Sequence, residues 1–264
     1  MKTENFLIAG NDTKMQECCK YIKSKGYEAK ISNEDGFWSE FSEFKNIILP
    51  LPTESNGILL GTGKDKESII RKLKDNQRIF YGNLSENPFG DKGYCYYTDE
   101  DFLKYNSKLT AQGVLKIILD SIQKDITHLK IAVTGYGNCG EAIVKLLSAN
   151  GADTTVFSRR KTLKPDNCLR KNMQEINSEI CNYDIIINTV PYNIISSEAV
   201  ESLNFSNLYI EVASKPYGFD YSSTDISGFK YINAYSLPGR YTPESAGQNI
   251  ARTVIRMIEE AENE

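Results

Sequence analysis

A glycine-rich loop between an apolar segment and a helical segment is the feature that most limits how this chain can fold. An extended segment at 130–134 precedes the loop, helical spacing follows over 141–150, and a second extended segment occupies 154–157. The G-x-G-x-x-G spacing alone is weak, but the strand, helix and second strand supply the context that the motif requires. The sequence therefore predicts a βαβ unit that binds a dinucleotide through the loop residues Gly135, Tyr136, Gly137, Asn138, Cys139 and Gly140.

Each glycine of this loop has its own physical task. Gly135 allows the tight turn after the strand, Gly137 lets the backbone approach a pyrophosphate, and Gly140 lets the helix pack closely on the strand. The N-terminus of the following helix adds amide donors and the positive end of its dipole. A glycine-rich turn that binds no ligand would use the same residues, and we favour binding because the surrounding unit matches so completely.

The end of the second strand indicates which dinucleotide is bound. Enzymes that use NAD usually place a carboxylate there, about 20 residues past the glycines, to accept the ribose 2′-hydroxyl. This chain has Ser158, Arg159, Arg160 and Lys161 instead. A hydroxyl followed by cations suits a 2′-phosphate, which arginine can bind through two hydrogen bonds. We therefore predict NADP, bound by Ser158, Arg159 and Arg160; the alternative is a solvated basic turn.

Two further strand ends are predicted to lie at the same edge of the sheet. Apolar segments at 184–188 and 208–212 lead into the loops 189–191 and 213–216. Ligands of open α/β sheets bind at the carboxyl ends of the strands. Plain turns explain these loops equally well, and the predicted cofactor contacts in them are Thr189, Val190, Pro191 and Ala213.

Strand-like and helix-like segments alternate along the whole chain. They predict an α/β protein with two Rossmann-like domains built on parallel sheets, the second a dinucleotide-binding Rossmann fold, and a cleft between them. The predicted parts are a flavodoxin-like or Rossmann-like substrate domain at 1–108, a linking helix at 109–127, the NADP-binding domain at 128–236, and a C-terminal helix at 237–264 that packs back on the first domain.

Composition argues against several other classes of protein. The formal net charge of the 264 residues is −4, without a dense Lys/Arg run, so a nucleic-acid surface is not expected. No apolar stretch approaches the roughly 18 residues of a membrane span, and the N-terminus lacks a secretory signal. Six cysteines without C-x-x-C spacing are typical of reduced thiols rather than of a metal site. We therefore expect a cytoplasmic protein that holds no metal.

The C-terminal part contains a longer signature. It runs from Tyr235 to Gln248 as YSLPGRYTPESAGQ, and INTVP at 187–191, ASKP at 213–216 and ILPLPTES at 48–55 accompany it. These segments resemble the A subunits of dipicolinate synthases, in the same order and over almost the whole chain. The chain departs from that family's pattern at Asn138, Gln112 and Lys215 and has a shorter first domain, which leaves its exact substrate open.

The resemblance implies an activity and a partner. The family would make this chain an NADP-dependent oxidoreductase that forms dipicolinate, the pyridine dicarboxylate of sporulation, at a branch of the lysine pathway. The substrate would be dihydrodipicolinate or its hydrated precursor, held between the two domains. The flavoprotein-like B subunit of the same synthase would be the partner, and the sequence does not tell whether activity requires it or whether the chain forms a homo-oligomer.

Oxidising a dihydropyridine dicarboxylate requires a hydride acceptor, a proton acceptor and anchors for two carboxylates. We expect Lys215 and Arg240 as catalytic residues, and we place Arg240 before a helix that starts at Pro243 with Thr242 as N-cap. A carboxylate held by Arg240 and the helix amides is one hypothesis, and a surface arginine is the other. Lys215, Tyr241 or water could accept the proton, and the predicted substrate-binding residues are Thr53, Ser55, Ser214 and Arg240.

Two alternative functions stay open from the sequence. The chain could be an NADP-dependent reductase of another small carboxylated imine or keto acid, or a non-catalytic NADP-binding subunit. The single histidine, His128, lies just before the first strand of the second domain, where a linker residue is the expected role. This argues against the histidine–acid relay of 2-hydroxy-acid dehydrogenases. Cys139 is expected to fill space against a neighbouring helix rather than to sense redox state.

Overall fold

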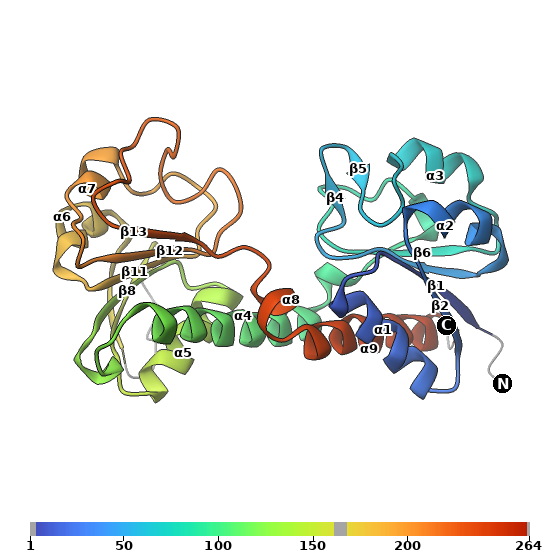
Figure 1. Ribbon diagram of the computed structural model, residues 1–264, viewed down its shortest axis with the longest axis horizontal. Helices are drawn as coiled ribbons and strands as arrows, with labels where there is room; N and C mark the ends of the chain where they lie inside the picture. Colours follow the sequence, from blue (N-terminus) through green and yellow to red (C-terminus); the bar gives the residue numbers. More distant parts are fainter. Residues whose placement is uncertain (1–3, 161–167, 263–264) are drawn as a thin grey trace. The chain divides into compact units, whose positions relative to one another are not determined.

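The computed structural model of the chain describes residues 4–160 and 168–262. The chain divides into two compact units, one formed by Met1–Asn106 with Pro238–Glu264 and the other by Ser107–Leu237 (Figure 1). We call them unit 1 and unit 2 and describe each by itself. In the described part of the chain, no helix has the length and apolarity to cross a membrane.

Unit 1 is built on a five-stranded sheet in which every neighbouring pair is parallel. The strand order is β2-β1-β3-β6-β7, which is the flavodoxin-like order 2-1-3-4-5. Two buried clusters lie on the two faces of the sheet, one with α1 and α9 and the other with α2 and α3 (Figure 1). The strands are β1 (Asn5–Ala9), β2 (Glu28–Ser32), β3 (Asn46–Ile48), β6 (Arg78–Tyr81) and β7 (Gly93–Cys95), and the helices α1 (Thr13–Ser24), α2 (Glu34–Glu40), α3 (Lys66–Lys72) and α9 (Pro243–Ala261).

The C-terminal helix α9 packs in unit 1, directly against α1. Gly247 makes the contact close, since a Cβ at that position would lie 2.1 Å from the backbone oxygen of Lys14 and 2.8 Å from the amide nitrogen of Cys18. Further along the helix, Arg256 forms an ion pair with Asp99 at 2.6 Å. The last segment of the chain therefore completes the core of the first unit.

A small antiparallel hairpin, β4 (Glu54–Ser55) and β5 (Ile58–Leu59), lies outside the main sheet of unit 1. Asn56 and Gly57 form its turn with positive φ values of 51° and 80°, as expected for an Asn-Gly hairpin turn. The sequence analysis predicted no hairpin here, so the hairpin is an addition to the predicted organisation.

Unit 2 is built on a six-stranded sheet whose neighbouring strands are all parallel. Its order, β10-β9-β8-β11-β12-β13, is the dinucleotide-binding order 3-2-1-4-5-6. The predicted fold class, α/β with parallel Rossmann-like sheets, is therefore confirmed. The elements are β8 (Lys130–Thr134), β9 (Asp153–Ser158), β10 (Leu169–Asn172), β11 (Ile185–Asn188), β12 (Leu208–Glu211) and β13 (Lys230–Asn233), with α5 (Asn138–Ala149), α6 (Ile176–Glu179) and α7 (Ser197–Glu201).

The helix between the two sheets starts earlier than its sequence pattern predicts. The prediction placed a linking helix at 109–127, whereas α4 extends over Glu100–Ser121 and the two units divide between Asn106 and Ser107. Its first turns carry charged and polar residues without a continuous apolar stripe, which explains why the sequence pattern starts late. His128 lies in a short 3-10 helix, Ile126–His128, where it is exposed.

Candidate functional site

The glycine loop of unit 2 follows β8 and leads directly into α5. Gly135 has a φ of 87°, and its amide donates to the carbonyl oxygen of Phe157 at 2.9 Å. A Cβ at Gly135 would lie 2.7 Å from Thr189 Oγ1, and one at Gly140 would lie 2.4 Å from the Gly135 carbonyl oxygen. The folded chain itself therefore requires glycine at both positions, as the tight turn and the close helix packing predict.

Gly137 differs from the other two glycines of the loop. Its φ is −87°, it is exposed, and a Cβ there would have no atom within 4 Å. Neither the backbone conformation nor the packing explains the absence of a side chain at this position. Close approach of a ligand to the backbone does explain it, which is the role that the motif predicts for this glycine.

The N-terminus of α5 has no side-chain cap, whereas those of α1 and α3 are capped by side chains. Asp12 caps α1 by accepting from Met15 N at 2.9 Å, and Asp65 caps α3 at 2.8 Å. Gly137 is the N-cap of α5 and makes no side-chain hydrogen bond there. The amides and dipole of α5 are therefore available to an anion, whereas the matching turn of unit 1 already holds a carboxylate.

The other residues of the loop have distinct positions. Asn138 is exposed and begins α5, while Tyr136 packs partly buried against the core. The Cys139 side chain faces α4, with its Sγ 3.5 Å from Ser107 Oγ, and burial raises the pKa of the thiol. The side chain of Cys139 thus points to α4, so the predicted contact between Cys139 and a cofactor requires its backbone amide.

The end of β9 places cations around a buried serine. The Ser158 hydroxyl accepts from Arg160 N at 3.2 Å, and the Ser158 carbonyl accepts from the Arg170 guanidinium at 2.8 Å. Arg159 and Arg160 are exposed, and Lys161 lies outside the described residues. Sequence reasoning missed Arg170 because it also missed β10, the polar edge strand that carries it.

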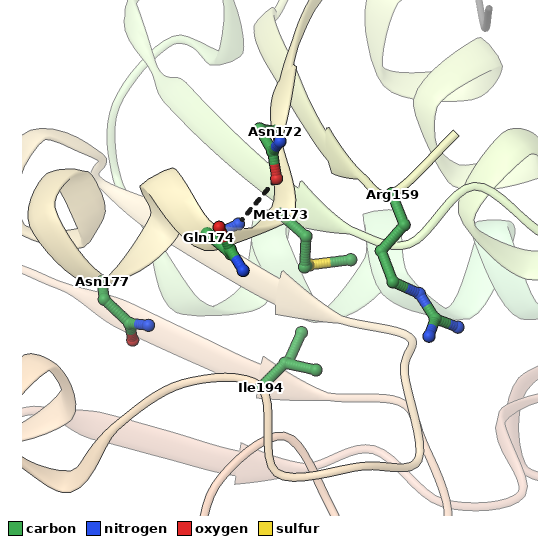
Figure 2. A pocket seen from close by; sticks show the side chains of 6 residues that line it. All are labelled: Arg159, Asn172, Met173, Gln174, Asn177 and Ile194. Carbon is green, nitrogen blue, oxygen red and sulfur yellow. Dashed lines mark hydrogen bonds between the residues drawn. The ribbon is translucent and has the colours of Figure 1, made fainter. Parts of the chain in front are cut away.

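A pocket of about 420 Å³ lies next to this turn (Figure 2). In Figure 2 the apolar ends of Met173 and Ile194 face the same space, with the Arg159 side chain on one side and Gln174 on the other. A space lined by two apolar and several polar side chains, with a cation at its edge, suits a flat ring that carries a phosphate nearby. Of the lining residues, only Arg159 was predicted; the others are Asn172, Met173, Gln174, Asn177 and Ile194.

The loop after β11 is organised by hydrogen bonds of the buried Asn188 and of Thr189. Asn188 Oδ1 accepts from Thr134 Oγ1 at 2.5 Å and from Val190 N at 3.1 Å. Thr189 Oγ1 donates to the Thr134 carbonyl at 2.7 Å, and of the three predicted residues only Pro191 is fully exposed. Thr189 and Val190 thus pack against the glycine loop, at the carboxyl edge where cofactor contact is predicted.

The loop after β12 presents Ser214 and Lys215 to solvent. Tyr217 N donates to the Ser214 carbonyl at 3.1 Å and closes a turn around the two residues. The Ala213 amide donates to the buried Glu211 carboxylate at 3.0 Å, so this amide already has a partner within the protein. Glu211 was not predicted as a site residue, although a carboxylate inside an apolar strand was a readable signal.

In unit 1 the structure corrects one predicted substrate contact. Thr53 is completely buried; its hydroxyl donates to the Pro50 carbonyl at 2.8 Å and accepts from Gly82 N at 2.8 Å. Both bonds hold the proline-containing loop against the sheet, so Thr53 has a structural position. Ser55 is exposed in the hairpin strand β4 and remains a predicted contact.

Lys14 is a candidate in unit 1 that sequence reasoning missed. It is buried, its Nζ donates to the Leu51 carbonyl, and a Cβ at Gly239 would lie 3.9 Å from its Cδ. The amine therefore lies between two segments of the family signature, the loop after β3 and the LPGR run. Burial lowers the pKa of Lys14. The readable signal was a lysine one turn before Cys18 on the buried face of α1.

Arg240 lies in a short helix, α8 (Leu237–Tyr241), and is exposed. Its guanidinium is 5.3 Å from the ring centre of Tyr241. Pro243 is the first residue of α9, as predicted, but the Thr242 side chain makes no capping hydrogen bond and donates to the Pro238 carbonyl at 3.2 Å instead. The N-terminus of α9 is therefore without a side-chain cap, next in sequence to Arg240.

The chain was compared with known proteins. No family model matches it. It is 25% identical over 240 residues to the dipicolinate synthase A subunit of Bacillus subtilis (strain 168), covering 85% of this chain and 81% of that protein. A crystal structure of dipicolinate synthase, A chain, from Bacillus subtilis has a TM-score of 0.81 with 22% identity, covering 100% of this chain and 98% of that one.

A dehydrogenase structure is also similar in fold. The NAD-complexed D-isomer-specific 2-hydroxyacid dehydrogenase from Lactobacillus delbrueckii ssp. bulgaricus has a TM-score of 0.59 with 12% identity, covering 98% of this chain and 97% of that one. The predicted resemblance to the dipicolinate synthase A subunits is thus confirmed, and so is the Rossmann-like fold. At 12% identity, the similarity to the dehydrogenase is one of fold.

Proposed function

We propose that this chain, which resembles the A subunits of dipicolinate synthases, is an NADP-dependent oxidoreductase that forms dipicolinate from dihydrodipicolinate or its hydrated precursor. The observation that carries the proposal is the open N-terminus of α5 beside Gly137, a glycine that the protein's own packing does not require. This arrangement suits the pyrophosphate of a dinucleotide. The similarity to a protein named for dipicolinate synthesis supports the substrate.

The choice of NADP over NAD rests on the residues at the end of β9. The two described residues directly after Ser158 are Arg159 and Arg160 rather than a carboxylate, and Arg159 lines the adjoining pocket. Arg170 adds a third guanidinium in this region, held through the Ser158 carbonyl. Guanidinium groups recognise a phosphate through paired hydrogen bonds, whereas a ribose 2′-hydroxyl is usually met by a carboxylate.

The chain's own residues supply binding and charge for the reaction. A bound nicotinamide would supply the hydride acceptor; a dihydropyridine that loses a hydride and a proton becomes an aromatic pyridine, and the hydrated precursor would also lose water. Lys215 and Ser214 stand at the carboxyl edge of unit 2, and Arg240 and Lys14 belong to unit 1; each pair includes a cationic side chain of the kind that binds a carboxylate. The proton that leaves the ring passes to Lys215, Tyr241 or water. Substrate binding by both units, and the cleft that it needs, stay predictions from the sequence.

NADPH formation at 340 nm tests the proposal. Purified protein receives NADP and freshly generated lysine-pathway product, with NAD as the comparison and pyridine-dicarboxylate absorbance as the product signal. Growth of both signals with NADP supports the proposal. Silence both alone and with the B subunit, in a sample that binds NADPH by titration, contradicts the proposed substrate, and failure to bind NADPH contradicts the cofactor as well.

Two other functions remain as outcomes of the same assay. Consumption of NADPH with another carboxylated imine or keto acid would indicate a reductase. NADPH binding without turnover of any such substrate would indicate a non-catalytic subunit. The named relative is one subunit of a synthase, so the assay is repeated with the B subunit added; activity only in its presence would make that protein an obligatory partner. A cytoplasmic location and a homo-oligomer remain predictions.

A further inference from the structure

A carboxylate without solvent exposure lies at the end of β12. Glu211 is 0% exposed, and its two oxygens accept three hydrogen bonds, from Asn188 Nδ2 at 2.7 Å, Ala213 N at 3.0 Å and Gly218 N at 2.9 Å. Burying an ionised carboxylate is costly, and hydrogen bonds to both of its oxygens offset part of that cost. A buried carboxylate that holds backbone amides fixes the segment to which those amides belong.

The two backbone amides belong to the two ends of one loop. Ala213 begins and Gly218 ends the segment that exposes Ser214 and Lys215, so the Glu211 carboxylate closes this loop on itself. The Gly218 carbonyl accepts from Ile194 N at 2.9 Å, which ties the same point to the loop after β11. The Glu211 carboxylate therefore fixes the positions of Ser214 and Lys215 through the backbone amides of Ala213 and Gly218.

We call the three hydrogen bonds to the Glu211 carboxylate the clamp, and further hydrogen bonds connect it to the neighbouring strands of the sheet. Asn188 is in register with Thr134 on one side and with Glu211 on the other, and side-chain hydrogen bonds of 2.5 and 2.7 Å join the three. Each of these residues is the last one of its strand, and the loops that follow carry the glycine motif, the predicted cofactor contacts and Lys215. A single buried network thus connects the three loops at the carboxyl edge of unit 2.

Two phenols face this carboxylate. Tyr209 lies two residues earlier on β12, and Tyr231 lies opposite it on β13; neither hydroxyl has a hydrogen-bond partner among the described residues. A Cβ at Gly218 would lie 2.6 Å from the Tyr209 hydroxyl oxygen, so this hydroxyl reaches the clamped end of the loop. Burial is the largest cause that raises the pKa of Glu211, to about 7, with the hydrogen bonds opposing it.

We propose that Glu211 is a positioning residue of this site, whose carboxylate holds both ends of the loop 213–218 and thereby presents Ser214 and Lys215 to the substrate. The identity of the substrate in this proposal rests on the proposed function, whereas the clamp does not. With the carboxylate ionised, all three donors have acceptors. When one oxygen carries a proton it turns donor, the hold on Ala213 or Gly218 weakens, and Lys215 loses its fixed position.

The substitution Glu211→Gln tests the clamp, because it keeps the side-chain shape and replaces one acceptor oxygen with a donor. We expect kcat/KM to fall about tenfold or more while the NADPH dissociation constant changes less than about threefold. In the unmodified chain kcat/KM should rise with pH through an inflection near pH 7, and the variant should lack that inflection. Glu198→Gln, at an exposed position of α7, is the matched control and should keep rate and profile.

Hydrogen exchange measures how firmly the clamp holds the loop 213–218, and it needs no substrate. Deuterium uptake of peptides covering 212–221, corrected for intrinsic rates, should rise in Glu211→Gln at pH 8 and should rise in the unmodified chain when the pH falls from 8 to 6. Gly218→Ala leaves the carboxylate in place and forces the loop away from Tyr209 and Asn188, so it should raise uptake and lower kcat/KM as well. This variant keeps the clamp testable if Glu211→Gln does not fold.

Three outcomes separate the possibilities. Unchanged uptake in both variants overturns the clamp. Raised uptake with an unchanged kcat/KM and pH profile overturns the positioning role. Raised uptake in a chain that oxidises no dihydropyridine dicarboxylate overturns the proposed function alone and leaves the clamp standing.

Discussion

At the scale of single residues, the glycine loop separates what the fold needs from what a ligand needs. Gly137→Ala adds a methyl group that meets no protein atom, at a φ of −87° that alanine adopts readily. We expect the melting temperature to stay within about 2 °C while the NADPH dissociation constant rises about tenfold or more, which corresponds to about 1.4 kcal/mol. Gly140→Ala is the contrast, because its methyl group would lie 2.4 Å from the Gly135 carbonyl oxygen and should lower stability too. Equal NADPH affinity for Gly137→Ala would show that no ligand approaches this backbone.

Cofactor preference is a second property of single side chains. Arg159 is exposed and lines the pocket at the end of β9, so Arg159→Ala should remove phosphate contact without a cost to folding. We expect the dissociation constant for NADP to rise about tenfold and that for NAD to stay within about twofold, as measured by calorimetric titration. Arg71→Ala, on α3 of unit 1, is the control. Equal losses for both cofactors would mean that Arg159 does not bind the 2′-phosphate.

Lys14 places a buried amine at the carboxyl edge of the first sheet, beside the LPGR run. Lys14→Met keeps an unbranched side chain of similar volume and removes the charge. We expect the KM for a dicarboxylate substrate to rise about tenfold while NADPH affinity is unchanged, because the dinucleotide motif lies in unit 2. A parallel loss of thermal stability with an unchanged KM would assign Lys14 to holding the Leu51 carbonyl alone.

At the scale of elements, the sequence predicts the interior of each sheet better than its edges. The central strands β1, β3, β8, β11 and β12 are short apolar runs, which is how strands buried on both faces read. The edge strands β10 and β13 have the sequences LRKN and KYIN, whose charged and polar residues suit solvent on one side and give no such run. The start of α4 was missed for a related reason, since its first turns lack an apolar stripe.

The packing of α9 on α1 makes a prediction at this scale. Gly247→Ala would place a methyl group 2.1 Å from the backbone oxygen of Lys14, and backbone cannot rotate away as a side-chain end can. We expect the helices to separate locally, at a cost of about 1 to 3 kcal/mol in the free energy of unfolding, measured by urea denaturation. Arg252→Ala, exposed on the same helix, should cost about 0.5 kcal/mol or less. Equal stability of Gly247→Ala and the parent chain would contradict the close contact.

At the scale of the whole molecule, the candidate site residues differ in how far their positions depend on distant parts of the chain. The predicted cofactor residues belong to a local motif, in which strand, loop and helix follow one another, so the glycine spacing in this context was enough to predict Gly135, Gly137 and Gly140. Lys14 and Glu211 acquire their roles only when segments far apart in sequence fold together, as when Glu211 meets Asn188 across the sheet. Thr53 shows the converse, because a hydroxyl at a loop looks available in the sequence and is enclosed in the fold.

The free energy of unfolding of the whole chain should depend on pH because of the buried Glu211 carboxylate. Burial raises the pKa of Glu211 from 4.5 to about 7, so between these values the folded chain keeps a proton that the unfolded chain has released. The free energy of unfolding therefore falls as the pH rises through this window, by up to about 3 kcal/mol, and levels off above it. Asp99 and Asp220 have lowered pKa values. Their contributions to the free energy of unfolding are therefore lost at a pH below this window. Urea denaturation at pH 5 and pH 8 should show this fall in the parent chain and a smaller one in Glu211→Gln; equal falls would mean that Glu211 is ionised at both pH values in the folded state.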